Sequence, residues 1–503
     1  MNNLSAVIKS LTPEEELQFE LFLKRKNKRK DTKNVELFLL LKEDNLSSKE
    51  IFNSLYNSDS KAAYHALRKR LFQSLIEFIS NKSINEENSI DMEIIKYLLA
   101  ARNFLTKNMP KMAYKILDKA EILALEHQLF PILNEIYHTK IQYAYLNQDV
   151  ELEALISKFR SNQKQQYLEE ELNLVYAQIR QTLNKINYKG EVINLENVLK
   201  QTFSDHHINI SESMSFKSFY QLMMIVSLSA YMDKNYLKIE PFLLKTYKSL
   251  KKHKTRHKQL FYHIQVVYMI ANALFRNKKF NASINYLNEM YELMNKQGNK
   301  YKNTYILKHN LLLALNLNYN DEQEKALSIL ENTPIKKNKD LESVLDIQLS
   351  LLMFYMQKED FKKAKNQASK FYHTDNYYTE KAGKEWTIKK NLAEIILFIE
   401  LQDIDLVESR VRSFKRSYSS YLKSINQGRV LTFLNFVEDY FKNPEIVLQP
   451  DFENKIENSF EWIETKAEDI FVMSFYAWLK SKMDKTPLYD TTLKLVAKAQ
   501  SVN

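Results

Sequence analysis

The chain has 503 residues, of which 45% are hydrophobic and 27% charged, with four glycines and no cysteine. Phosphate-binding loops, dinucleotide-binding turns and nucleophile elbows each need closely spaced glycines, and disulfides, thiolate nucleophiles and Cys-containing zinc sites need cysteine, so the composition argues against all of them. The net charge of +11 is spread along the chain and carried mostly by lysine, so it does not by itself indicate a nucleic-acid partner.

The first 19 residues lack the pattern of a secretory signal, because the apolar run Ala6–Ile8 is followed by Lys9 and then by three consecutive glutamates. No apolar run approaches the roughly 20 residues that a membrane-spanning helix needs. We therefore expect a soluble, cytoplasmic protein.

Apolar residues recur at helical spacing along almost the whole chain, which predicts an all-α fold. The first clear helix is predicted to begin at Pro13, with Thr12 as its N-cap and Glu15 completing a capping box. The segment Ser47–Glu50 repeats this pattern. A polar stretch over residues 80–89 predicts a domain boundary, so residues 1–80 are expected to form an N-terminal helical module.

This module carries two basic clusters, over residues 24–30 and 68–70. The spacing of residues 49–65 resembles the helix-turn-helix of response-regulator and quorum-sensing transcription factors, although Phe52 stands where that motif has a small residue. The resemblance implies that the second helix contacts DNA. A solvated helix end and loop would explain the same charges. The candidate nucleic-acid contacts are Lys24, Arg25, Lys28, Arg29, His65, Arg68 and Arg70.

Pairs of amphipathic helices recur over residues 90–428. The small or apolar residues that follow successive turns are spaced by about 42 residues, which corresponds to two helices of roughly 15 to 18 residues and two turns. We predict an α-solenoid, because one helix pair buries only one face and the next pair must cover the other. Residues 429–503 are expected to form C-terminal helical repeats or a cap. The anchors of the period are Ala113, Ala154, Ile239, Ser283, Ala326, Ala364 and Val407.

The units anchored at Ala113, Ser283 and Ala364 resemble the tetratricopeptide repeat. They share its small residue in the first helix, the aromatic or large residues that follow, and the small residue that opens the second helix. The family repeat has 34 residues, so these units are tetratricopeptide-like with lengthened helices. The resemblance implies a right-handed superhelix of antiparallel helix pairs, in which the first helices line a concave groove for a peptide or a partner helix.

In this register, one first helix directs four side chains toward the groove. These candidate peptide-binding residues are Gln265, Tyr268, Asn272 and Arg276. Tetratricopeptide grooves hold peptide backbone or carboxylate with asparagine and basic residues, and the resemblance implies the same role for Asn272 and Arg276.

No pattern predicts a catalytic residue, a cofactor or a metal site. His253 and His257 lie one helical turn apart but stand among five basic residues, and Asp205–His207 lacks further ligands at suitable spacing. The acidic triplets at residues 14–16 and 169–171 point in different directions on a helix, so they do not predict paired carboxylates.

The sequence thus favours a non-enzymatic scaffold that binds another protein or a peptide and has no membrane partner. The alternative is a transcriptional regulator, in which the N-terminal module binds nucleic acid and a tetratricopeptide-like domain senses a ligand or peptide.

Overall fold

The computed structural model describes most of the chain, and the chain divides into two compact units, Met1–Phe159 and Arg160–Asn503. The division falls within the long helix α9 (Leu152–Asn184). The described residues are 3–9, 11, 13–26, 33–42, 48–56, 61–86, 90–147, 149–185, 215–233, 236–252, 258–335, 340–425, 427–459 and 469–501.

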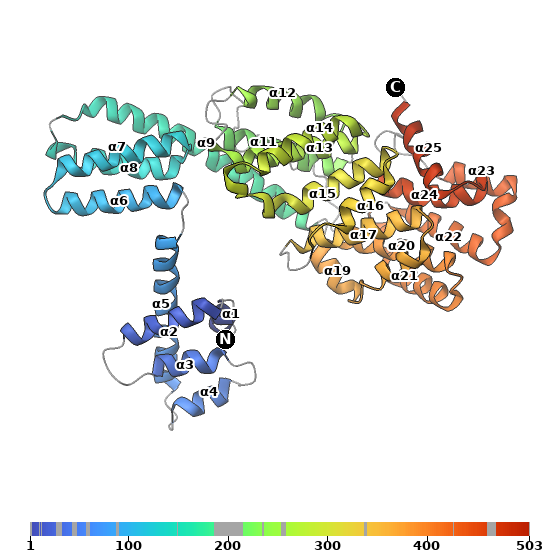
Figure 1. The fold of residues 1–503 in the computed structure, drawn as a ribbon, viewed down its shortest axis with the longest axis horizontal. Helices are drawn as coiled ribbons and strands as arrows, with labels where there is room; N and C mark the ends of the chain where they lie inside the picture. Colours follow the sequence, from blue (N-terminus) through green and yellow to red (C-terminus); the bar gives the residue numbers. More distant parts are fainter. Residues whose placement is uncertain are drawn as a thin grey trace. The chain divides into compact units, whose positions relative to one another are not determined.

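The N-terminal helices of the first unit are arranged around α3, which packs against α1, α2, α4 and α5 (Figure 1). Their shared core includes Phe19, Phe38 and Leu71, and the rings of Phe19 and Phe38 meet edge to face with centroids 5.1 Å apart. These helices are α1 (Asn3–Lys9), α2 (Pro13–Lys26), α3 (Lys33–Lys42), α4 (Ser48–Leu55) and α5 (Lys61–Glu86). Helices α2 and α4 begin at the predicted Pro13 and Ser48.

Three more helices of the first unit, α6 (Ile90–Thr106), α7 (Pro110–Glu126) and α8 (Phe130–Gln142), enclose a second core. Leu117, Ala120 and Ile136 are fully buried in it. A short 3₁₀ turn, η1 (Ala144–Leu146), leads toward α9. Helix α5 continues to Glu86 through much of the polar stretch at 80–89. The domain boundary expected in that stretch stays a prediction.

In the second unit, helices that follow one another in the chain pack side by side, as α13 with α14, α14 with α15, α15 with α16 and α20 with α21 (Figure 1). Two buried clusters run along these contacts. The elements are α11 (Phe216–Asp233), α12 (Glu240–Lys251), α13 (Leu260–Arg276), α14 (Phe280–Met294), η4 (Gln297–Asn299), α15 (Lys302–Tyr319), α16 (Gln323–Glu331), α17 (Leu341–Gln357), α18 (Phe361–Ala368), α19 (Asp375–Ala382), α20 (Lys384–Glu400), α21 (Ile404–Ser424), α22 (Gly428–Lys442), η5 (Pro444–Leu448), α23 (Pro450–Ser459), α24 (Ile470–Asp484) and α25 (Leu488–Ser501).

The predicted all-α fold is confirmed, because the described residues form helices joined by turns and contain no strand. Helices pack against their neighbours, as in a helical repeat. None of the helices in the described ranges combines the length and the apolar character that crossing a bilayer requires.

Among the described residues, seven helix connections use the same turn, and none of the seven has glycine at the left-handed position. In each, one residue takes the left-handed conformation, and the N–H of the following residue bonds to the carbonyl five positions earlier at 2.8–3.1 Å, as in a Schellman motif. The left-handed residues are Asn108, Gln128, Lys278, Asp321, Glu359, Gln402 and Lys485, with φ between 52° and 63°. In these seven connections, polar side chains stand in a conformation that favours glycine.

We expect Gln402→Gly to raise the free energy of unfolding by about 1 kcal/mol. The left-handed conformation costs a residue with a Cβ roughly 1–2 kcal/mol, and the larger chain entropy of glycine offsets part of that gain. Gln402 has φ 56° and an exposed side chain, so few contacts are lost with it. Urea unfolding measures the change, with Gln402→Ala as the control. Equal stabilities of the Gly and Ala variants would contradict the explanation.

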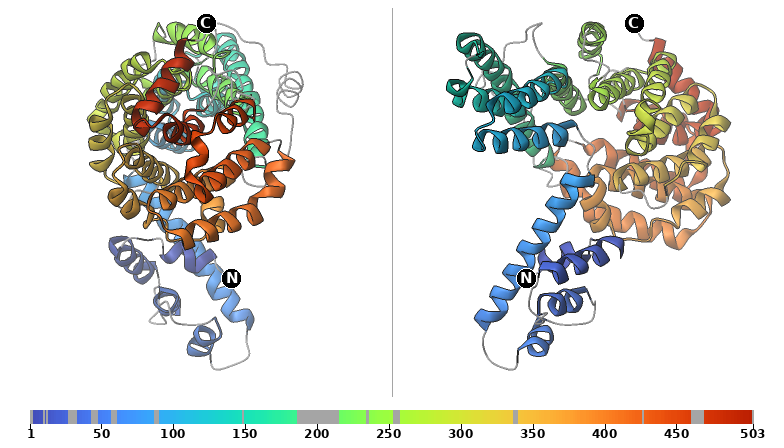
Figure 2. Two further views of the ribbon diagram at one scale, coloured as in Figure 1. Left: turned by 90° about the vertical axis from the view of Figure 1, so that its right-hand side faces the viewer. Right: turned by 60° about the vertical axis from the view of Figure 1, so that its left-hand side comes forward.

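The C-terminal helices α24 and α25 form a hairpin that packs against helix ends distant in sequence (Figure 2). Ser474 of α24 contacts Tyr319 at 3.1 Å and Gln357 at 3.4 Å, at the ends of α15 and α17. In α25, Tyr489 donates to the carbonyl of Asn318 at 2.7 Å, and Gln500 donates to that of Lys278 at 2.8 Å. We call α24 and α25 the C-terminal hairpin. Its contacts hold together the carboxyl ends of α13, α15 and α17.

Candidate functional site

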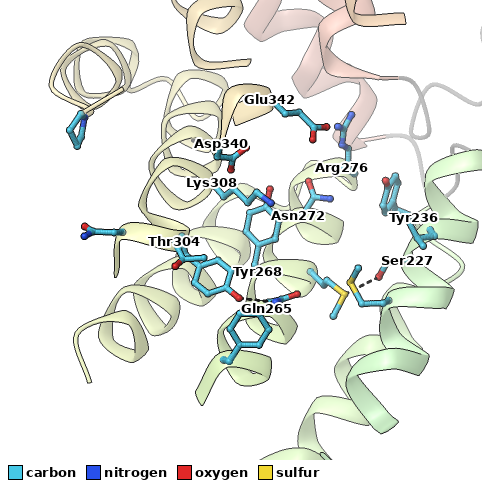
Figure 3. A pocket seen from close by; sticks show the side chains of 17 residues that line it. Ser227, Tyr236, Gln265, Tyr268, Asn272, Arg276, Thr304, Lys308, Asp340 and Glu342 are labelled. Atoms are coloured by element: carbon cyan, nitrogen blue, oxygen red, sulfur yellow. Dashed lines mark hydrogen bonds between the residues drawn. The ribbon is translucent and has the colours of Figure 1, made fainter. Parts of the chain in front are cut away.

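A pocket of about 1000 Å³ lies in the second unit between α11, α13, α15 and the beginning of α17 (Figure 3). All four predicted groove residues line it. Helix α13 presents them because Gln265, Tyr268, Asn272 and Arg276 are three or four positions apart and share one face, while the opposite face of the helix is buried in the core. The structure thus brings the predicted residues together.

Gln265 is bonded at both ends of its amide. Tyr220 of α11 donates to its Oε1, and its Nε2 donates to the hydroxyl of Tyr305 in α15 at 2.7 Å. The Gln265 side chain therefore ties three helices together and forms part of the pocket wall. Its role as a peptide contact stays a prediction.

Arg276 is held by a carboxylate from the C-terminal hairpin. Its Nη1 donates to Asp469, which directly precedes α24. Lys389 of α20 lies 3.8 Å from the same carboxylate. The guanidinium therefore enters the pocket already bonded to an anion, a contact between residues 193 positions apart.

Several polar side chains of the pocket keep donors available, among them Tyr268, Asn272 and Lys308. Within the described ranges, Tyr268, Asn272 and Lys308 make no hydrogen bond or ion pair with other residues. In Figure 3 the ends of these three side chains point into the same part of the pocket. Burial raises the pKa of Tyr268 above its usual range, so the phenol stays protonated and can donate.

Lys308 is a pocket residue that sequence reasoning missed. It precedes Leu311 by three positions in α15, as Gln265 precedes Tyr268 in α13. Leu311 follows Tyr268 by 43 positions, the same spacing as between the predicted anchors Ser283 and Ala326, so the predicted register places it in correspondence with Tyr268. Applying the same register to Gln265 would therefore have identified Lys308.

The side of the pocket formed by the beginning of α17 is acidic. Asp340 caps α17 by accepting from the Ser343 N–H at 3.2 Å, and Glu342 follows in the first turn. One turn further along α17, burial and the neighbouring Glu342 raise the pKa of Asp346 from its ordinary 3.8 to about 7. These acidic residues were not predicted, because their approach to α13 depends on how two helix pairs pack.

Apolar side chains line the wall nearest α11. Met224 and Leu228 of α11 lie there with Met269 of α13, whose Sδ accepts from Ser227 at 3.7 Å. The pocket therefore combines an apolar wall with a polar region of both charge signs. Such a combination suits a peptide, which has apolar side chains and a polar backbone.

The candidate nucleic-acid contacts of the N-terminal module have different environments. Lys28 and Arg29 lie outside the described residues. Lys24 is paired with Glu20 at 2.6 Å, while Arg25 is exposed at the end of α2. Arg68 donates to the Tyr64 hydroxyl at 3.3 Å and lies over its ring. His65 and Arg70 are exposed on α5.

The two predicted basic clusters occupy different parts of the module. Lys26 pairs with Glu77, which fixes the end of α2 beside the second half of α5. Glu77 is about 11 to 14 Å along the helix axis from residues 68–70, given a rise of about 1.5 Å per residue. At the junction of α4 and α5, Phe52 meets Tyr64 edge to face at 5.4 Å, so an aromatic ring fills the position where the motif has a small residue.

Metal ligands are not gathered anywhere in the described ranges, which contain no cluster of three or more His, Asp or Glu side chains suited to an ion. The pairs at residues 253–257 and 205–207 lie outside those ranges. A second, polar pocket of about 590 Å³ in the first unit contains the buried Lys140, which is paired with Glu121 and, at 2.6 Å, with Asp118.

The chain matches no known protein family and no curated protein.

Proposed function

We propose that the protein is a non-enzymatic scaffold that binds a peptide segment or a helix of another protein in the pocket between α11, α13, α15 and α17. The observation that carries the proposal is that the four groove residues chosen from sequence line one pocket of about 1000 Å³. Donors available on Tyr268, Asn272 and Lys308 would meet backbone carbonyls or a carboxylate. Met224 and Met269 would adapt to an apolar side chain.

The proposed architecture is a right-handed, tetratricopeptide-like α-solenoid with a period of about 42 residues. It is supported by helices α14, α16, α18 and α21, which begin at Phe280, Gln323, Phe361 and Ile404 after equivalent left-handed turns. In such a solenoid the first helices of successive pairs form one continuous surface. A groove for an elongated ligand then follows from the repeat itself.

Peptide selection from a random display library on the full-length chain tests the function. We expect Lys308→Met, and separately Asn272→Ala, to weaken binding of the selected peptides about tenfold, because a hydrogen bond to a charged group contributes about 1.5–3 kcal/mol. Lys325→Met is the matched control, since Lys325 is exposed on α16 away from the pocket. Peptides that bind all three variants as tightly as the unmodified chain would contradict the proposal.

The regulator alternative stays a prediction. The exposed side chains of His65 and Arg70 on α5 could face a phosphate backbone, but Arg68 is packed on Tyr64. More independent observations support peptide binding in the pocket than support the regulator alternative. A cytoplasmic location is likewise part of the proposal.

A further inference from the structure

Arg276 belongs both to the pocket and to the contact that holds the C-terminal hairpin. It lines the pocket from the last turn of α13, and its Nη1 donates to Asp469. Asp469 is also the N-cap of α24, where it accepts from the backbone N–H of Phe471 at 2.9 Å and of Val472 at 3.4 Å. One carboxylate thus begins a helix and pairs with a pocket residue.

The pocket and the hairpin use opposite ends of α15 and α17. The pocket is lined by residues 303–308 of α15 and by residues 340 and 342 at the start of α17. The hairpin contacts Tyr319 at the end of α15 and Gln357 at the end of α17. Arg276, at the end of α13, takes part in both sites.

The charges around Arg276 make a second anion costly. Figure 3 shows Glu342 facing Arg276 across the pocket, and Asp469 is bonded to the guanidinium. An anionic ligand group that approaches Arg276 meets both carboxylates, so Asp469 must move away or share the guanidinium. Lys389, whose Nζ lies 3.8 Å from the Asp469 carboxylate, would still attract that carboxylate after it leaves Arg276.

We propose that an anionic group in the pocket and the docked N-terminus of α24 compete for Arg276, so that ligand binding loosens the C-terminal hairpin. This inference rests on the proposed function, because it takes the pocket as the binding site. Coupling of this kind is reciprocal: docking of α24 lowers the anion affinity by the same factor by which a bound anion lowers docking, so weakening the hold of Asp469 on Arg276 should strengthen anion binding. Ligand binding in the pocket then changes how firmly the C-terminal hairpin is docked.

Asp469→Asn is the decisive variant, because asparagine caps a helix about as well as aspartate but carries no charge. The probe is 1-anilinonaphthalene-8-sulfonate, an aromatic anion matched to the Met and Tyr side chains of the pocket. Asp403→Asn is the matched control: Asp403 caps α21 by accepting from the Leu406 N–H at 3.3 Å and does not line the pocket.

On the full chain we expect Asp469→Asn to tighten probe binding about five- to tenfold by fluorescence titration, with no change in Asp403→Asn. Arg276→Gln should weaken binding and abolish the effect of Asp469→Asn when the two are combined. By hydrogen exchange, the probe should speed exchange in the first turns of α24 in the unmodified chain. Lys389→Gln is a second variant, and it should increase the release of α24 by the probe.

The coupling is overturned if Asp469→Asn leaves both the probe affinity and the exchange of α24 unchanged while Arg276→Gln still weakens binding. In that case the pocket and the proposed function stand. If neither Arg276→Gln nor Lys308→Met alters probe binding, the pocket is not the binding site, and both the coupling and the proposed function fail.

Discussion

Trp478→Ala should lower the free energy of unfolding of the second unit by about 3–5 kcal/mol, the range for truncating a large buried aromatic side chain. Trp478 is 2% exposed and is among the largest fully buried side chains. Its ring meets Tyr440 of α22 edge to face at 5.5 Å, and its indole N–H donates to Glu400 at the end of α20. Truncation leaves a cavity between three helices and removes one of two partners of Glu400, which also pairs with Lys482 at 2.7 Å.

Tyr372→Ala is the control, because Tyr372 is also a large aromatic residue but is 79% exposed. Its removal should change the stability by no more than about 0.5 kcal/mol. Thermal unfolding followed by circular dichroism compares the two variants. Similar losses in both would mean that Trp478 does not hold the C-terminal hairpin against α20 and α22.

The fold class followed from sequence because helical periodicity is a local property. The apolar residues of α13 repeat every three or four positions, and that pattern alone placed Gln265, Tyr268, Asn272 and Arg276 on one face. The scarcity of glycine argued against phosphate-binding loops and nucleophile elbows. It did not indicate that residues such as Lys278 would take the left-handed conformation, because polar side chains at helix ends have no unique backbone geometry.

The contacts of the site residues could not be predicted, because they come from distant segments. Arg276 has the spacing and charge of a peptide-binding residue, but Asp469 approaches it from 193 positions away. The side-chain amide of Gln265 is already hydrogen-bonded to Tyr220 and Tyr305, which belong to neighbouring helices. Periodicity identifies the face of a helix, whereas the partner of each side chain depends on how helices from distant segments pack.

In the N-terminal module too, the sequence shows which residues are charged but not what each side chain contacts. The cations at residues 68–70 were predicted as one cluster, but on α5 Arg68 lies over the Tyr64 ring while Arg70 is exposed. A helix turns by about 100° per residue, so adjacent residues meet different surroundings. Charge runs in sequence therefore overstate the charge that any one helix face presents.

Asp346→Asn should stabilise the second unit at pH 8 by up to about 4 kcal/mol, since each unit of pKa shift corresponds to about 1.36 kcal/mol. Burial, with Glu342 adding repulsion, raises the pKa of Asp346 from 3.8 to about 7. The native state therefore binds the proton between about pH 4 and 7, where the unfolded chain has lost it. Stability contributed by this group falls as the pH rises through that window. Asparagine removes the ionisation.

The sign of this effect tests which force dominates at Asp346. We expect the stability difference between variant and unmodified chain, measured by urea unfolding, to be smallest near pH 4, to grow up to pH 7 and then to level off. Asp405→Asn, at an exposed carboxylate in the first turn of α21, should show no such rise. If attraction to Arg276 and Lys389 outweighed burial, Asp346→Asn would instead destabilise the unit at pH 8. That outcome would make Asp346 a permanent anion one helical turn beyond the pocket residue Glu342.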